Sequence, residues 1–318
     1  MARCGYTAAG TQRWKCKNCK KVICRKRNDV GERNRIRLVE RWLTGTESLP
    51  QIAKRIGKHR TTLSKKFSKL FNKIKSVPLS LSTDSNVLVL DGTTISKGKI
   101  ALIVYDRISK QPLAWSFVER EYFESWYILL EKVRRKNYST TIAIVSDGQK
   151  GLRKAVSAVF PGIMHQRCII HIIRLSLSWL TKNPKTDAGI ELRKLVCVIG
   201  KIKTNQEAKL WEKYFEEWDE KYSLFLKEKS INPATGRKWH THRKLRGVRS
   251  LIKTAIPNMF LYSRDARIPN TTNCVEGGIN SRIAELLHRH RGINEKQKIA
   301  LVRSFLYLKR KTSTRNAT

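Results

Sequence analysis

The sequence predicts an α/β protein built on a mixed β-sheet with helices on both faces. Between residues 84 and 171, short runs of aliphatic and β-branched residues alternate with amphipathic helical segments. Residues 172–268 follow a helical period almost throughout, which predicts an all-α insertion after the sheet. With 318 residues and 40% hydrophobic content, the chain can bury one large core or two smaller ones.

The charge of the chain indicates a polyanionic partner. It has 66 Lys and Arg residues against 25 Asp and Glu residues, which gives a net charge of +41. Nucleic acid is the commonest partner of so basic a protein, and an anionic membrane is the alternative. The longest apolar run, "CIIHIIRLSLSWL", is interrupted by His171 and Arg174 and is shorter than the roughly 18 residues of a spanning helix. The amino terminus has no apolar signal region, so we expect a cytoplasmic protein whose seven cysteines are thiols or metal ligands.

The first 28 residues predict a small zinc-ribbon-like segment. Cys16 and Cys19 have the C-x2-C spacing with which a turn presents two thiolates to one zinc ion. The other half of the site is incomplete, because Met1 stands where a cysteine paired with Cys4 would be. The candidate zinc ligands are Cys4, Cys16, Cys19 and Cys24. The alternative is a degenerate ribbon with reduced thiols and no metal.

Residues 29–77 predict a helix-turn-helix. A helical pattern begins at Glu32 and breaks at Thr44, and a short second helix, "LPQIAKRIG", ends at Gly57. The third helix, "KHRTTLSKKFSKLFNKI", has one apolar and one basic face, as expected of a helix that lies in the major groove. Its candidate DNA-contacting residues are Arg60, Thr61, Thr62, Lys65 and Lys66. The alternative is a three-helix bundle with a solvated basic face, and a Pro/Ser-rich linker follows at residues 76–86.

The segment from residue 84 to residue 171 predicts the sheet. Three strands, "VLVLDGTTI", "IALIVYD" and "PLAWSFV", form an antiparallel meander, and the helix "FESWYILLEKVRRK" follows them. The strand "TIAIVSDG", the helix "GLRKAVSAVF" and a short strand around "IMHQRC" complete the order of a ribonuclease H-like fold. Asp91 and Asp147 each end an apolar strand. Because the first and fourth strands of that fold are neighbours, we expect the two carboxylates to meet.

A cluster of carboxylates in so basic a protein predicts a divalent cation, because neighbouring carboxylates otherwise repel one another. Two Mg²⁺ ions about 4 Å apart activate an attacking hydroxyl and stabilise the leaving oxygen of a phosphodiester. Glu276 is a candidate third acid, and its competitors, which lie beside an aromatic stripe and have lysines for partners, are Glu212, Glu216 and Glu217. The spacing of Asn273, Glu276 and Asn280 places them on one helix face, and the following pair, Gly277 and Gly278, would permit close backbone approach.

Each acid also has a purely structural interpretation. Asn273 and Glu276 fit a capping box, in which the glutamate only satisfies backbone amides. Asp147 fits an N-cap of the helix that starts near Gly151, and Asp91 fits a turn residue at a strand end. The sequence pattern leaves these alternatives open.

The insertion carries an aromatic stripe and a basic loop. The stripe consists of Trp211, Phe215, Trp218, Tyr222 and Phe225, and its helical spacing predicts core packing. Residues 232–250 are predicted to form a basic loop that contacts DNA through phosphates and stacking, with Arg237, Lys238 and Trp239 as candidates. Residues 269–318 are predicted to hold the helix of Glu276 and a basic carboxyl-terminal tail.

Three segments together resemble the mutator-type transposases of bacterial insertion sequences. "SDGQKGLRKAVSAVFPGIMHQRCIIHIIR" is similar to the signature around the family's second aspartate, "LDGTT" to its first-aspartate motif, and "TTNCVEGGINSRI" to its glutamate motif. "GTQRWKCKNC" resembles the amino-terminal zinc ribbon of some members. The resemblance implies that Asp91, Asp147 and Glu276 are a DDE triad that binds Mg²⁺ or Mn²⁺.

The resemblance also includes a C-x2-H pair, Cys168 and His171, to which no chemical role is attached. Together with His165 the pair makes H-x2-C-x2-H. Three ligands at one strand-helix junction do not easily enclose a zinc ion, so structural packing is the favoured interpretation of these residues.

By this resemblance, the expected function is that of a bacterial or archaeal DDE transposase. Such an enzyme binds terminal inverted repeats, cleaves DNA strands with Mg²⁺ and joins the freed 3′ end to target DNA. Because two element ends are cut together, we expect a homodimer or a larger assembly on DNA. The alternatives are a non-catalytic DNA-binding protein derived from a transposase, and a structure-selective nuclease of the ribonuclease H-like fold.

Overall fold

The computed structural model describes residues 1–8, 10–24, 34, 37–43, 45, 47–73, 86–135 and 141–315. The chain divides into two compact units, each described by itself below. The first comprises Met1–Val77 with Ala300–Leu308, and the second comprises Pro78–Ile299 with Lys309–Thr318. Most of the predicted linker, and the beginning of the first predicted helix at Glu32, lie outside the described residues.

The first unit begins with a small antiparallel sheet in the order β1-β2-β3. Its strands are β1 (Ala2–Tyr6), β2 (Gln12–Lys15) and β3 (Val22–Cys24). The Arg3 guanidinium lies 5.9 Å from the centroid of the Trp14 ring. Every described residue of these strands is exposed or half-buried, so apolar burial contributes little to the stability of this sheet.

The described residues that follow β3 in the first unit are mainly helical. Residues 37–43 are helical, and α2 (Leu49–Arg55) and α3 (Arg60–Lys73) follow, as the sequence predicts for the second and third helices. Ser48 caps α2 in a capping box with Gln51, and Gly57 adopts a φ of +63° in the turn before α3. The buried residues of the helices in this unit are Val39, Trp42, Leu43, Ile52, Ala53, Leu63, Phe67, Leu301, Val302, Phe305, Leu306 and Leu308.

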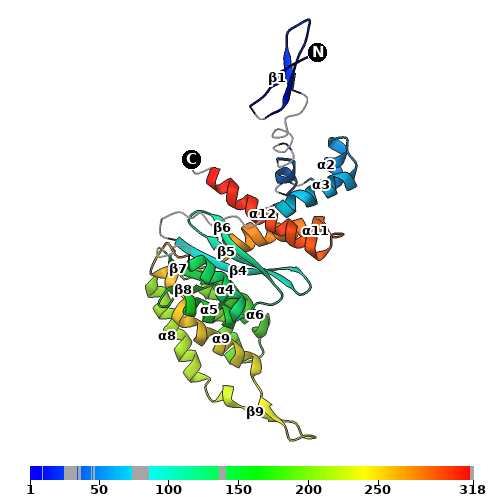
Figure 1. Ribbon diagram of the computed structural model, residues 1–318. Coiled ribbons are helices and arrows are strands. Elements are labelled where there is room, and N and C mark those ends of the chain that lie inside the picture. The colour runs from blue at the N-terminus through cyan, green and yellow to red at the C-terminus, as the bar shows by residue number, and fades with distance from the viewer. Residues whose placement is uncertain are drawn as a thin grey trace. The chain divides into compact units, whose positions relative to one another are not determined.

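The second unit is built on a five-stranded mixed sheet in the order β6-β5-β4-β7-β8 (Figure 1). The strands are β4 (Asn86–Ser96), β5 (Lys99–Asp106), β6 (Gln111–Val118), β7 (Thr141–Ser146) and β8 (Met164–Arg167). The first three form an antiparallel meander, whereas β4 pairs with β7, and β7 with β8, in parallel. The predicted adjacency of the first and fourth strands is therefore confirmed.

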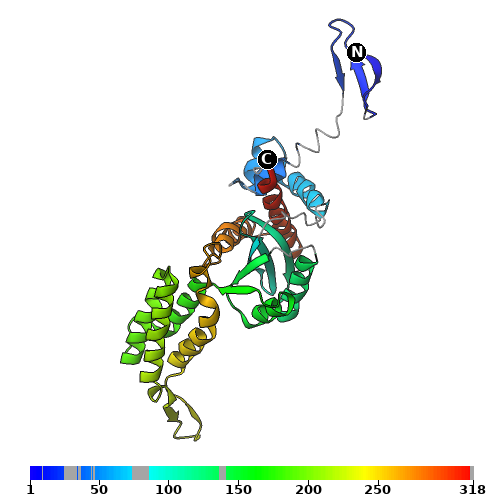
Figure 2. The same cartoon turned by 90° about the vertical axis from the view of Figure 1, so that its left-hand side faces the viewer.

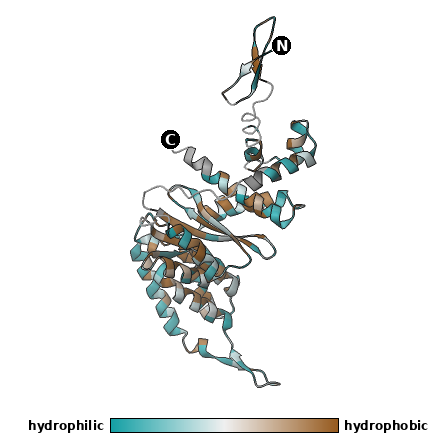
Figure 3. Cartoon of the chain, viewed as in Figure 1, coloured by the Kyte–Doolittle hydropathy of each residue, from teal (hydrophilic) through white to brown (hydrophobic). Residues whose placement is uncertain are grey.

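Helices contact both faces of this sheet. On one face, α4 (Phe123–Arg134) and α5 (Lys150–Val159) enclose a hydrophobic core that includes Leu88, Leu90 and Trp126 (Figure 2). Beyond the opposite face, α10 (Asn273–Val275) and α11 (Ser281–Arg289) contact β4. Hydrophobic residues are concentrated in the sheet and in the helices packed beside it (Figure 3).

The insertion is a helical bundle with its own core. Its helices are α6 (Ile169–Leu180), α7 (Asp187–Val198), α8 (Asn205–Lys221) and α9 (Arg243–Met259). Trp211, Phe215 and Trp218 are buried in this core, and the ring centroids of consecutive members are 5.7 and 5.9 Å apart. The predicted core role of the aromatic stripe is confirmed. The bundle begins with Ile169, three residues before the predicted boundary.

The basic segment at 232–250 is not a loop as predicted. Its first part belongs to a hairpin of β9 (Lys229–Ile231) and β10 (Lys238–His240), and residues from Arg243 onward begin α9. The hairpin, coloured yellow in Figure 1, extends from the end of the helical bundle. The turn is formed by Asn232, whose carbonyl accepts from the amide of Gly236 at 2.8 Å and whose Oδ1 accepts from Ala234.

The chain ends with α10, a π-helical turn η4 (Glu276–Asn280), α11 and α12 (Glu295–Arg315). A π-helical turn closes i to i+5 hydrogen bonds and is frequent at functional sites. None of the helices in the described ranges is both long and apolar enough to cross a membrane.

Candidate active site

Asp91 lies within β4 and not at its end. Its neighbours continue to pair with β5 as far as Ser96, so the prediction that this strand ends at Asp91 is wrong. The parallel pairing of β4 with β7 stops at Val89, so Asp91 lies two residues beyond the part of β4 that is paired on both sides. Asp91 Oδ1 accepts from the amide of Gly92 at 3.0 Å, and Oδ2 accepts from Asn280 Nδ2 at 2.7 Å.

Asp147 follows directly after β7. Its Oδ1 accepts from the amide of Gln149 at 2.9 Å, which closes a tight turn. The N-cap of α5 is Gln149, so the alternative in which Asp147 caps this helix is wrong. Gly148 has a φ of +83°, and a Cβ atom there would overlap the side chain of Arg167. The positive φ and this close approach both favour glycine at position 148.

Glu276 begins the π-helical turn, and side chains hold its carboxylate. Thr272 Oγ1 donates to Oε1 at 2.5 Å, and Arg174 Nη1 donates to Oε2 at 3.1 Å. His171 Nδ1 lies 3.7 Å from Oε1. Because α10 starts at Asn273 with Thr272 as its N-cap, the Asn273–Glu276 capping box does not form.

The π-helical turn also changes the predicted face of this segment. Asn273 is exposed, whereas Asn280 reaches Asp91, so the three predicted residues do not share one environment. Gly277 and Gly278 are exposed, and no atom lies within 4 Å of the position of a Cβ at either glycine. Within the described residues no backbone lies against these glycines, so close backbone approach at this position stays a prediction.

Glu276 and Asp147 lie close enough to Asp91 to change the pKa of Asp91. Burial raises the pKa of Asp91 to about 7, and the charges of Glu276 and Asp147 add to this, while His171 opposes it. Burial also acts to raise the pKa of Glu276, but the Thr272 hydroxyl, His171 and Arg174 outweigh it and lower the pKa overall. The site therefore combines one readily ionised glutamate with one aspartate whose charge is unfavourable.

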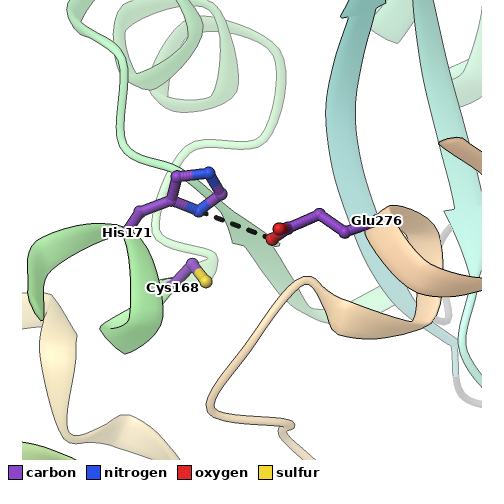
Figure 4. A group of neighbouring side chains, drawn as sticks. All are labelled: Cys168, His171 and Glu276. Carbon is purple, nitrogen blue, oxygen red and sulfur yellow. Dashed lines mark ion pairs between the residues drawn. The ribbon is translucent and has the colours of Figure 1, made fainter. Parts of the chain in front are cut away.

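Cys168 and His171 meet Glu276 (Figure 4). The Sγ atom of Cys168, one ring nitrogen of His171 and one carboxylate oxygen of Glu276 all lie within 4.8 Å of one another. Among the described residues, no other group of three Cys, His, Asp or Glu side chains has its ligand atoms this close together. Asp91 and Asp147 do not belong to this group.

Hydrogen bonds and charge account for this cluster. The amide and hydroxyl of Thr272 both lie 3.4 Å from the buried Cys168 Sγ. Burial acts to raise the pKa of this thiol, but hydrogen bonds from His171 and Thr272 lower it overall. The hydrogen bond with Cys168 raises the pKa of His171 to about 9, assisted by Glu276 and Asp147. Cys168 and His171 therefore each favour the ionised form of the other beside the glutamate.

The H-x2-C-x2-H triplet is not brought together as one site. His165 Nε2 lies 2.8 Å from Ser146 Oγ, and His165 is not part of the cluster. The third member of the cluster, beside Cys168 and His171, is Glu276. Sequence reasoning did not identify Thr272 and Arg174. The position of Arg174 one helical turn after His171 was a signal for its place on the same face of α6.

The predicted DNA-contacting residues are displayed to solvent within their own elements. Arg60, Thr61, Thr62, Lys65 and Lys66 are all exposed on α3, while Leu63 and Phe67 of the same helix are buried. On the hairpin, Arg237 and Lys238 are exposed and Trp239 is 41% exposed.

The four predicted zinc ligands are free thiols at this small sheet. Cys4, Cys16 and Cys24 are half-buried and Cys19 is exposed. A hydrogen bond from the backbone of Cys19 is the main cause that lowers the pKa of Cys16, as in a turn that stabilises a thiolate. Within residues 1–8 and 10–24, no three of these cysteines have ligand atoms within 4.8 Å of one another.

Comparison with known proteins gives one family. The model of "Transposase, Mutator family" matches residues 62–232, which include Asp91 and Asp147 but end before Glu276. The chain is 30% identical over 152 residues to the transposase for insertion sequence element IS905 of Lactococcus lactis, a match that covers 45% of this chain and 38% of that protein. It is 26% identical over 195 residues to the transposase for ISRM3 of Rhizobium meliloti, covering 61% of this chain and 42% of that protein.

A further match, 29% identical over 122 residues, is the transposase for IS6120 of Mycolicibacterium smegmatis, covering 36% of this chain and 38% of that protein. The chain thus matches less than half of the length of each of these relatives. Because the family model covers more than half of the chain, the protein belongs to the Mutator family of transposases.

Proposed function

We propose that this protein is a DDE transposase that uses Asp91, Asp147 and Glu276 to cleave and join DNA strands at the ends of an insertion sequence. The observation that carries the proposal is the electrostatic coupling of three acids from different elements, in which Glu276 and Asp147 both raise the pKa of Asp91. The strand order β6-β5-β4-β7-β8, with an antiparallel meander beside two parallel strands, supports a ribonuclease H-like fold.

The donor set fits Mg²⁺ or Mn²⁺. Carboxylate and amide oxygens are the ligands that these cations prefer. Asn280 Oδ1 is buried and, among the described residues, has no hydrogen-bond partner, although the Nδ2 of the same amide is bound to Asp91. A divalent cation held by Asp91, Asp147 and Glu276 would offset their repulsion, activate an attacking hydroxyl and stabilise the leaving oxygen of the phosphodiester.

The protein's own residues prepare these acids. The Gly92 amide and Asn280 fix both oxygens of Asp91. Protonated His171, together with Arg174, stabilises the ionised form of Glu276. In this proposal Cys168 acts through His171, because its hydrogen bond with the imidazole raises the pKa of His171.

We further propose that DNA binds through two basic surfaces. The exposed residues of α3 would contact the terminal inverted repeats as the last helix of a helix-turn-helix, and Lys238 and Trp239 of the hairpin would contact phosphates and bases. Cys4, Cys16, Cys19 and Cys24 are proposed to close around zinc in the amino-terminal sheet. Because two ends are cut together, the active form is proposed to be a dimer or larger, acting on DNA in the cytoplasm.

The test is Mg²⁺-dependent cleavage of a duplex that carries the element's own end. We expect Asp147→Asn to abolish cleavage while leaving DNA binding intact, because the amide cannot replace an anionic ligand. Asp187→Asn changes an exposed aspartate at the start of α7 and is the matched control. Full cleavage by Asp147→Asn would show that this residue is not a ligand. If the unmodified protein binds the duplex without cleaving it, the protein is a non-catalytic DNA-binding protein. If it cuts any branched duplex regardless of sequence, it is a structure-selective nuclease.

A further inference from the structure

A fourth acid, Glu121, lies between β6 and α4 and is held in a fixed orientation. The indole Nε1 of Trp126 donates to Glu121 Oε1 at 2.9 Å. Trp126 is fully buried in the core between the sheet and the helices, so its N–H requires an acceptor within the protein. This contact fixes one oxygen of the Glu121 carboxylate. The other oxygen, Oε2, has no hydrogen-bond partner among the described residues.

The segment around Glu121 packs against β4 on one side and against the residues that follow β7 on the other. A Cβ atom at Gly92 would lie 2.9 Å from Glu121 Oε2, so the carboxylate packs against the residue next to Asp91. On the other side, Gln149 Nε2 donates to the carbonyl of Glu121 at 3.0 Å. A Cβ atom at Gly151 would lie 2.9 Å from the amide nitrogen of Phe123. Glycines at both positions thus allow this segment to lie against β4 and the turn after β7.

The charge of Glu121 is left without a cationic partner. Burial raises its pKa and the charge of Asp147 raises it further, although the Trp126 hydrogen bond opposes this. By contrast, Glu119 is exposed and pairs with Lys99 at 3.0 Å. Glu121 has no ion pair with any described residue. The negative charge of a half-buried carboxylate near other carboxylates is unfavourable, and a bound cation would offset it.

The two glutamates of the site also differ in how they are engaged. Thr272 binds Oε1 of Glu276, and Arg174 binds Oε2, so both oxygens of that carboxylate already have partners. Glu121 Oε2 is the free oxygen on the face of β4 where Gly92 stands.

We propose that Glu121 is a further ligand of the divalent cation bound by Asp91 and Asp147. This inference rests on the proposed function, since it adds a residue to the same metal site. The geometry assigns Glu121 Oε2 as the ligand atom, with the Trp126 indole as the group that orients it. The relevant cations are Mg²⁺ and Mn²⁺, which take oxygen ligands.

The experiment measures Mn²⁺ binding to the full chain in the absence of DNA, by the electron paramagnetic resonance signal of free Mn²⁺. We expect Glu121→Gln to weaken Mn²⁺ binding by about tenfold or more. Loss of a residue that only hydrogen-bonds to a metal ligand typically weakens binding by about this factor, and the loss of a direct ligand should cost at least as much. Gln keeps an oxygen for the Trp126 indole, so the fold is retained, and the tryptophan fluorescence of the variant confirms this. Glu119→Gln, two residues away and exposed, is the matched control and should change binding less than about twofold.

Asp91→Asn separates this inference from the proposed function. If Asp91→Asn weakens Mn²⁺ binding and Glu121→Gln does not, the role of Glu121 is overturned and the proposed function stands. If neither variant weakens binding, the metal site itself is wrong. Glu121→Asp keeps the charge but withdraws the oxygen by one methylene. We expect it to bind Mn²⁺ more weakly than the unmodified protein, and unchanged binding would overturn Glu121 as a direct ligand.

Discussion

In the absence of a cation, burial and the charge of Glu276 raise the pKa of Asp91 from its usual value of 3.8 to about 7. The unfolded chain therefore releases this proton at lower pH than the folded protein does. Between about pH 4 and pH 7 the folded state binds more protons, so its stability falls as the pH rises. At pH 8 without metal, the charge of Asp91 destabilises the fold by about 4 kcal/mol.

Asp91→Asn should therefore stabilise the metal-free protein at pH 8 by up to this amount while abolishing cleavage. Urea unfolding in the presence of a chelator, followed by tryptophan fluorescence, measures the difference. The control, Asp187→Asn, should change the free energy of unfolding by less than about 1 kcal/mol. A destabilised Asp91→Asn would mean that Asp91 is compensated by partners within the protein.

His165 has the opposite dependence on pH. Burial, assisted by Arg153 and Arg167, lowers its pKa from 6.5 to about 4. Between these values the unfolded chain binds more protons, so the contribution of neutral His165 is complete above about pH 6.5 and is lost as the pH falls toward 4. His165→Gln cannot titrate, and its stability should fall less between pH 7 and pH 5, by of order 1 kcal/mol. Equal losses of stability in both proteins would show that His165 is not buried in its neutral form.

At this scale the sequence identified acids but not their partners. Asp91 and Asp147 were found because each follows an apolar run, a local signal. Glu276 required the resemblance to a known family. Thr272 contacts Glu276, which is 4 residues away, and Cys168, which is 104 residues away. Only the contact with Cys168 is too distant in the sequence to be predicted from local spacing. Glu121 was missed because its role depends on packing against Gly92 and Trp126, which no period in the sequence records.

Among the elements, the close packing of α5 against the segment before α4 depends on Gly151. A Cβ atom there would lie 2.9 Å from the amide nitrogen of Phe123 and 3.2 Å from the carbonyl carbon of Tyr122, both backbone atoms that cannot move independently. Gly151→Ala should therefore destabilise the protein by about 1 to 3 kcal/mol. At Gly200 a Cβ would meet only Ile173 Cδ1 at an ordinary 3.5 Å, so Gly200→Ala should stay within about 0.5 kcal/mol. Urea unfolding of the two variants compares them, and equal stability would contradict this packing.

The order of the elements was more predictable than their ends. The period-2 strands and amphipathic helices gave the sequence order and the adjacency of β4 and β7. The hairpin of β9 and β10 was missed because its strands, "KSI" and "KWH", have no alternating apolar residues. The turn signal around Asn232 and Gly236 is compatible with a loop as well as with a hairpin. The π-helical turn at Glu276 departs from the residue spacing of a regular helix, which is the basis of the predicted face.

For the whole molecule, the net charge of +41 is the property that most strongly constrains its partner. Basic residues are exposed on α3 in the first unit and on the hairpin in the second. Each phosphate neutralised by such a residue releases counterions, so the logarithm of the affinity for duplex DNA should fall linearly with the logarithm of salt concentration.

The slope of that line tests whether α3 binds DNA. Its steepness should fall by about 0.9 for each lost phosphate contact, so by about 1.8 in the double variant Lys65→Ala, Lys66→Ala. Lys213→Ala is the control, because Lys213 lies on α8 in the insertion and pairs with Glu217 at 3.8 Å. Fluorescence anisotropy of a labelled duplex that carries the element's end, titrated at several salt concentrations, gives the three slopes. If the double variant and the unmodified protein share one slope, these lysines face solvent in the complex, and α2 and α3 are a small helical bundle with a solvated basic face.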